Sequence, residues 1–239
     1  MIGPFAKDNE HVMGSWKKFG KTKDVVPFYE CMLKEFGSKA NFEYVRGCDF
    51  EGDDKSEFDA AYQAALKSDL VVLYLGEKAW WSGENASRSS LNLPRIQEEL
   101  VKHLATSSKK IVVVLSSGRP VVLSEIEPLV DPIIAVWEPG TAGSAPLAGI
   151  LSGRINPSGK LPITFPYSTG QIPIYYNYRQ SARPYQGHYQ DVQAQPLYSF
   201  AHGLSYTTYE YSDIKLSKDK IGKTEKLKAT ITVKNTGKR

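Results

Sequence analysis

The strongest constraint on the fold of this chain is the alternation of short apolar runs with stretches of helical periodicity. Three runs rich in β-branched residues, at 69–76, 110–116 and 131–137, have the length and composition of strands buried on both faces. A weaker fourth run lies at 42–47, and residues 1–5 resemble the end of a further strand. Strands of this kind form parallel sheets that carry helices on both faces. The sequence therefore predicts an α/β domain in which a mostly parallel sheet is sandwiched between helices.

Four helices are expected from apolar residues spaced three and four positions apart, which bury one stripe of a helix against a sheet. The stretches run over 25–36, 56–67, 94–106 and 142–151. Pro94 supports the start of the third stretch, because a proline in the first helical turn removes no intrahelical hydrogen bond.

The loops that leave the strands are the first place to look for function. In a parallel sheet covered by helices, the strand-to-helix connections lie at one edge, where such folds bind their ligands. These loops follow Gly76, Ser116 and Trp137. A nucleotide-binding domain of this class would need a glycine-rich turn after the first strand, but the chain has Gly3-Pro-Phe-Ala there. That class is therefore excluded.

The chain changes character after Pro157. An extended stretch rich in Pro, Tyr and Gly follows, and its beginning, 160–166, is expected to be an edge strand. We therefore divide the chain into an α/β sandwich domain at 1–168, an extended connecting segment at 169–206 and a tail at 207–239. The tail alternates like two strands of a β-sandwich, which could not bury a core alone. It is expected to begin a further domain.

Charge and hydropathy exclude several classes of partner. The net charge is +4, and the tail after Tyr206 carries nine basic and four acidic residues. Because strands of this kind place such residues on solvated faces, no nucleic-acid or membrane partner is predicted. No apolar run reaches the roughly 18 residues of a membrane span, and no leader follows Met1. Any export signal is expected upstream of this sequence.

Cysteine and histidine give no sign of a metal or a cofactor. Cys31 and Cys48 lack metal-ligand spacing and a CxxC motif, so both are expected to be small buried side chains. A disulfide between them is left open. The four histidines share no spacing: His11, His103, His188 and His202. Neither a metal nor a cofactor is predicted.

The stretch 75–94 carries the most informative motif. Its residues are Leu-Gly-Glu-Lys-Ala-Trp-Trp-Ser-Gly-Glu-Asn-Ala-Ser-Arg-Ser-Ser-Leu-Asn-Leu-Pro, and its two carboxylates are Glu77 and Glu84. This pattern resembles the second domain of family 3 glycoside hydrolases, whose members have a Gly-Glu strand end and then Ser-Gly-Glu-x-x-Ser-Arg-x-x-Leu-x-Leu-Pro. The match is nearly position for position.

Further motifs of the same family follow, so that eight stand in order over almost the whole chain. They include Ser117-Gly-Arg-Pro, Trp137-Glu-Pro-Gly, Gly149-Ile-Leu-Ser-Gly, Asn156-Pro-Ser-Gly-Lys-Leu-Pro-Ile-Thr-Phe-Pro, Gly170-Gln-Ile-Pro-Ile-Tyr-Tyr-Asn and Gly203-Leu-Ser-Tyr-Thr. Phe200-Ala-His-Gly departs from the family's Phe-Gly-Tyr-Gly. The resemblance implies the family's α/β sandwich fold. It also implies that the tail is the start of a fibronectin type III-like domain.

The resemblance further implies a chemical role for Glu84. The glutamate of the family's Ser-Gly-Glu motif is the general acid/base of a retaining exo-β-glycosidase, expected here to be of the β-glucosidase type and to act on β-linked glucosides or oligosaccharides. Retaining hydrolysis also needs a nucleophilic carboxylate roughly 5 to 5.5 Å away. In the family this is an Asp in a Ser-Asp-Trp-type motif of a preceding barrel domain, and no Ser-Asp-Trp occurs here. The chain is therefore expected to be a fragment that is inactive without an upstream barrel domain. Its relatives imply a periplasmic or extracellular location.

Neighbours of the expected acid have expected roles of their own. Glu77 should support the loop, by hydrogen bonds or by pairing with Arg88, whose planar fork suits fixed geometry. Trp81 is the candidate substrate-binding residue, since sugar rings stack on exposed aromatic faces. For Trp81 and Trp80 the alternative is burial against the loop or a domain interface. Residues 116–120 are expected to form only a turn. A non-catalytic carbohydrate-binding or assembly domain is the alternative function.

Overall fold

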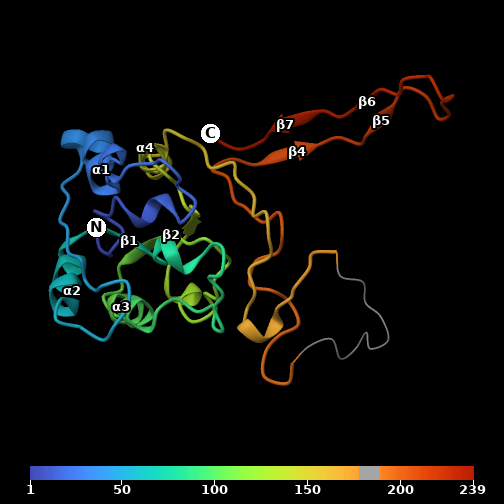
Figure 1. Ribbon diagram of the computed structural model, residues 1–239. Coiled ribbons are helices and arrows are strands. Elements are labelled where there is room, and N and C mark those ends of the chain that lie inside the picture. Colours follow the sequence, from blue (N-terminus) through green and yellow to red (C-terminus); the bar gives the residue numbers. More distant parts are fainter. Residues whose placement is uncertain (178–188) are drawn as a thin grey trace. The chain divides into compact units, whose positions relative to one another are not determined.

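A computed structural model describes residues 1–177 and 189–239 of the chain (Figure 1). Its central sheet has three parallel strands in the order β1 (Leu70–Gly76), β2 (Lys110–Ser116) and β3 (Ile133–Ala135). In β1 and β2 every residue after the first is buried, as expected of strands covered on both faces. The predicted parallel sheet is confirmed.

Two pairs of α-helices cover the two faces of this sheet. They are α1 (Phe28–Phe36) with α4 (Ser144–Leu151), and α2 (Phe58–Lys67) with α3 (Arg95–Ala105). Leu73 of β1 lies in the core with α2 and α3, whereas the next residue, Tyr74, lies in the core with α1 and α4. Because successive strand side chains point to opposite faces, the two helix pairs lie on opposite sides of the sheet, as Figure 1 shows. The predicted sandwich is confirmed.

Prolines set two of the helix starts. Helix α1 begins directly after Pro27 and α3 directly after Pro94. The expected stretch 25–36 therefore loses its first turn, because the residue before a proline is disfavoured in the helical conformation. Single-turn 3-10 helices occur at His11–Met13, Thr22–Asp24, Gly37–Lys39, Ala79–Trp81, Glu127–Leu129 and Thr169–Gln171.

The weak strand expected at 42–47 is reduced to an isolated bridge. Ile2 forms parallel bridges to Val45 and to Leu73 of β1, so the N-terminal residues lie beside the sheet without extending it as a ladder. Pro4 has no N–H to donate, which prevents a regular strand from continuing there.

Strand β3 is shorter than the predicted run 131–137. Pro132 precedes it and cannot donate to the ladder, while Trp137 has a positive φ of 54° that no strand accommodates. The chain therefore turns sharply at Trp137, and Glu138 follows at the same edge of the sheet as the ends of β1 and β2.

Among the residues that the structure describes, the edge strand expected at 160–166 is reduced to an isolated antiparallel bridge between Phe165 and Tyr198. Pro162 and Pro166 interrupt the donors that a ladder would need. The predicted connecting segment 169–206 includes residues 178–188, which lie outside the described residues.

By its contacts the chain divides into two compact units, 1–155 with 160–202 and 156–159 with 203–239. The second unit contains two short antiparallel ladders. They are β4 (Tyr209–Tyr211) with β7 (Val233–Asn235), and β5 (Lys215–Leu216) with β6 (Ala229–Thr230). No residue of 203–239 is buried, so the two predicted tail strands are present without a core of their own.

Candidate active site

The acid-bearing loop leaves the sheet where β1 ends beside β2. Gly76 pairs with Ser116 in register, and the backbone N–H of Glu77 donates to the Ser116 carbonyl at 2.9 Å. Gly76 has a φ of +150°, and a Cβ there would approach the Ser116 carbonyl oxygen to 1.8 Å. Only glycine fits this crossing. The loop is thereby directed over the end of β2.

The buried side-chain amide of Gln97 on α3 binds the same end of β1. The Gln97 side chain is fully buried, accepts a hydrogen bond from the Gly76 N–H at 2.9 Å and donates to the Gly76 carbonyl at 2.9 Å. It also donates to the Phe50 carbonyl at 2.8 Å. Gln97 was not predicted from the sequence. The available signal was a polar residue on the apolar stripe that continues through Leu100 and Leu104.

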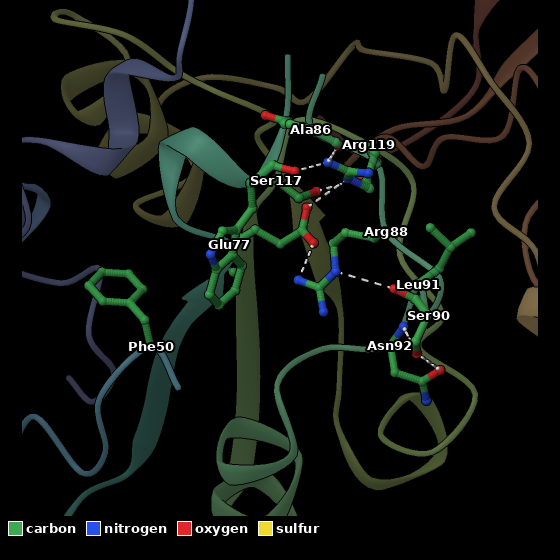
Figure 2. A network of polar contacts seen from close by, with 12 residues as sticks. Phe50, Glu77, Ala86, Arg88, Ser90, Leu91, Asn92, Ser117 and Arg119 are labelled. Atoms are coloured by element: carbon green, nitrogen blue, oxygen red, sulfur yellow. Dashed lines mark hydrogen bonds and ion pairs between the residues drawn. The ribbon is translucent and has the colours of Figure 1, made fainter. Parts of the chain in front are cut away.

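Two guanidinium groups meet the buried carboxylate of Glu77, whose residue is only 3% exposed. Arg88 Nη1 donates to Glu77 Oε1 at 2.9 Å, and Arg119 Nε lies 3.3 Å from Oε2 as an ion pair without hydrogen-bond geometry (Figure 2). Burial raises the pKa of the Glu77 carboxyl, and the charges of Arg119 and Arg88 partly offset this rise. The expected pairing of Glu77 with Arg88 is confirmed. Arg119, expected only as part of a turn, is a second partner.

Glu84 is exposed at the far end of the loop. Its neighbours Gly83 and Asn85 both have positive φ, 112° and 60°, so the backbone bends on each side of it. Within the part of the chain that the structure describes, its carboxylate forms no hydrogen bond and no ion pair. Glu84 is therefore presented outward, where it can meet a ligand.

Three tryptophans gather around this loop. Trp81 is half-buried, with the Arg88 guanidinium 4.9 Å from its ring centre. Trp80 is 55% exposed, and both line a pocket of about 610 Å³ beside the loop. Trp16 is 63% exposed and lies against Gly83. Trp16 was not predicted from the sequence, because it comes from a segment far from the loop in the chain.

Other side chains singled out in the sequence have ordinary surroundings. Cys31 and Cys48 are buried free thiols, and burial raises the pKa of Cys48 to about 12. Over residues 1–177 and 189–239, no group of three His, Cys, Asp or Glu side chains could hold a metal ion. Within the same ranges, no helix has the length and apolar character of a membrane span. His188 lies outside the described residues.

Comparison with known proteins identifies the family to which this architecture belongs. The profile of the Glycosyl hydrolase family 3 C-terminal domain matches residues 1–206. The chain belongs to glycoside hydrolase family 3. It is 35% identical to the periplasmic beta-glucosidase of Salmonella typhimurium, over all of this chain and 35% of that protein. It is 33% identical to a beta-xylosidase of Formosa agariphila, over all of this chain and 34% of that protein.

Solved structures agree with this family membership. The chain is 34% identical to the beta-glucosidase from Listeria innocua in complex with isofagomine, with a TM-score of 0.88 over 98% of this chain and 33% of that chain. A beta-glucosidase from Erythrobacter marinus gives a TM-score of 0.80 at 30% identity, over 100% of this chain and 35% of that chain. The family 3 chain thus spans about a third of the length of these relatives.

Proposed function

We propose that this chain is part of a retaining exo-β-glycosidase of the β-glucosidase type and that Glu84 is its general acid/base. The observation that supports this most directly is the exposed Glu84 carboxylate at the end of a braced loop at the carboxyl edge of the sheet. This is the edge at which α/β folds bind ligands. The substrate is a β-linked glucoside or oligosaccharide, and the enzyme works in the periplasm or outside the cell, as the name of the Salmonella relative suggests.

The proposed reaction has two steps. In the first, Glu84 gives its proton to the glycosidic oxygen while a carboxylate nucleophile forms an ester to the anomeric carbon, and the aglycone leaves as an alcohol. In the second, Glu84 takes a proton from water, whose oxygen attacks the anomeric carbon and releases the sugar and the nucleophile. The nucleophile comes from an upstream barrel domain, since this sequence has no Ser-Asp-Trp motif. Trp81 contributes an aromatic face to the substrate.

Replacing Glu84 by Gln in the complete protein tests this assignment. For glucosides with poor leaving groups kcat should fall about 100- to 10,000-fold, the range that general acid catalysis supplies. Aryl glucosides with activated leaving groups need little protonation, so their first step should be much less affected. Added azide should restore turnover of the activated substrates, because an anion can attack the glycosyl ester without a general base. The control is Glu30→Gln, which changes an exposed carboxylate on α1.

Steady-state kinetics over a series of aryl β-glucosides of graded leaving-group pKa measures these effects. A Glu84→Gln enzyme with the unaltered rate for every leaving group would refute the role.

A further inference from the structure

The position of Glu84 depends on what holds its backbone, because the side chain has no hydrogen bond or ion pair within the described residues. Residues 83–85 are exposed, and the backbone around them is held by two long bonds in the described residues, from the Ser82 N–H to the Ala79 carbonyl at 3.5 Å and from the Ala86 N–H to the Gly83 carbonyl at 3.3 Å. A free segment of this kind samples many conformations. A general acid must be held in a single conformation, since a displacement of its carboxylate by about 1 Å can cost about 100-fold in rate.

Arg119, which lies outside this segment in the sequence, binds the backbone on both sides of it. Its Nη2 donates to the Trp81 carbonyl and, at 2.9 Å, to the Ala86 carbonyl. These carbonyls lie on the two sides of Glu84, so one guanidinium nitrogen ties the beginning of the exposed segment to its end. Figure 2 shows Arg119 between Glu77 and Ala86.

The guanidinium is itself held at the sheet edge. Glu77 lies 3.3 Å from Arg119 Nε, and the Ser117 hydroxyl donates to the Arg119 carbonyl at 2.8 Å. The same carboxylate binds Arg88, whose Nε donates to the Ser90 carbonyl at 3.2 Å. Arg119 and Arg88 therefore connect both halves of the loop to the buried carboxylate of Glu77. The backbone N–H of Glu77 is in turn bonded to the Ser116 carbonyl of β2.

A third strand end adds an independent contact. The Ser82 hydroxyl donates to Glu138 Oε1 at 2.8 Å, directly after β3 and its turn at Trp137. Gly118 lies against both groups, and a Cβ there would come within 2.0 Å of the Ser82 hydroxyl oxygen. The glycine of Ser117-Gly-Arg-Pro thus leaves room for this contact, while its arginine reaches the carbonyls.

We propose that Arg119 is a positioning residue for the general acid/base: its guanidinium clamps the Trp81 and Ala86 carbonyls and so fixes the carboxylate of Glu84 toward the glycosidic oxygen. The proposal rests on the proposed function of Glu84. Arg119 does not touch the reacting atoms. Its several donors in one rigid plane let a single side chain meet two carbonyls and a carboxylate, which the single ammonium of lysine cannot reproduce.

The first experiment measures the clamp on this chain itself, without reference to catalysis. In Arg119→Ala the hydrogen-bonded amides of Ser82 and Ala86 should exchange hydrogen at least about tenfold faster, while those of β1 and β2 keep their protection. The matched control is Arg154→Ala, which removes an arginine paired with Glu35 on α1. Unchanged exchange of the Ser82 and Ala86 amides would overturn the proposal.

The second experiment measures the effect on catalysis in the complete protein. Arg119→Ala should lower kcat for glucosides with poor leaving groups by about 100-fold, with KM little changed and with a smaller loss on activated aryl glucosides. Arg119→Lys should recover only part of the loss, and Arg154→Ala none. In a Glu84→Gln background, the same Arg119 change should cost little more, because it acts through the absent acid.

The outcomes separate the two proposals. An equal Arg119→Ala loss in both backgrounds, or an equal loss on both kinds of substrate, would mean a general structural role and would overturn the positioning role. If Glu84→Gln shows no dependence on the leaving group, the proposed acid/base fails while the exchange measurement still judges the clamp. If Arg119→Ala does not fold, Glu77→Gln weakens the same guanidinium and should give a smaller loss in the same direction.

Discussion

At the scale of single residues, the side chains around the acid-bearing loop are of two kinds: those that belong to the loop's own motif, and those that come from other strand ends. Glu77 and Arg88 stand in one motif, and opposite charges eleven positions apart on a strand-end loop were a fair basis for predicting their pair. Arg119 and Glu138 come from other strand ends; both stand in family motifs, but the sequence assigned Arg119 only to a turn and gave Glu138 no role. Their role depends on three-dimensional proximity to residues 81–86, which a motif cannot express.

Trp81 illustrates how a partner can limit an aromatic side chain. Arg88 and Lys78 both lie over its ring, at 4.9 Å and 5.5 Å from the ring centre, so a stacked sugar would compete with cation–π contacts. Replacing Trp81 by Ala in the complete protein should raise KM for substrates with bulky aglycones about fivefold, which corresponds to a stacking contact worth about 1 kcal/mol. Tyr211→Ala, an exposed aromatic in the second unit, is the control. Unchanged KM for every aglycone would remove Trp81 from the substrate site.

At the scale of elements, the strands and helices with strong periodicity were predicted and the sheet edges were not. The runs that became β1 and β2 are uninterrupted, so backbone preference and burial agree there. The runs at 42–47, 131–137 and 160–166 contain or meet a proline or a left-handed residue at a position that a ladder would need. Each shrank to a short strand or a bridge for that local reason.

The joint between α3 and β1 gives a prediction at this scale. Gln97→Leu removes the amide that satisfies the Gly76 N–H, the Gly76 carbonyl and the Phe50 carbonyl. Since leaving a buried polar group unpaired costs about 1 to 3 kcal/mol, the free energy of unfolding should fall by about 3 kcal/mol. Urea unfolding of this chain measures it, with Gln63→Leu on the exposed face of α2 as the control. A loss below about 1 kcal/mol would mean that water or a shifted backbone replaces the amide.

At the scale of the whole molecule, the chain carries the proposed general acid/base, and the proposed nucleophile belongs to another domain. We propose the domain division 1–168, 169–206 and 207–239, with the last part the beginning of a fibronectin type III-like domain. Support comes from a second unit in which residues 203–239 have no buried side chain, so its ladders would gain stability only from further strands.

The same scale carries the prediction about activity. This chain alone should not hydrolyse activated aryl β-glucosides above the rate of Glu84→Gln, because the proposed nucleophile belongs to the barrel domain, and titration with glucose or cellobiose should show no binding. Co-expression with the barrel domain of the same protein should produce turnover that depends on Glu84. Sugar binding by the isolated chain, measured by calorimetry, would favour the carbohydrate-binding module instead.

Local patterns along the chain were enough for the parallel sandwich and for the Glu77–Arg88 pair, because burial, helical periodicity and motif spacing are properties of neighbouring residues. The acid/base role of Glu84 is implied by the family motif and stays a proposal. Folding alone brought Arg119, Glu138, Gln97 and Trp16 to the loop. Each arrives from a different element, and contact between distant segments is set by how strands align in register and how helices pack. That geometry converts an ordinary turn arginine into the group that spans both sides of an exposed carboxylate.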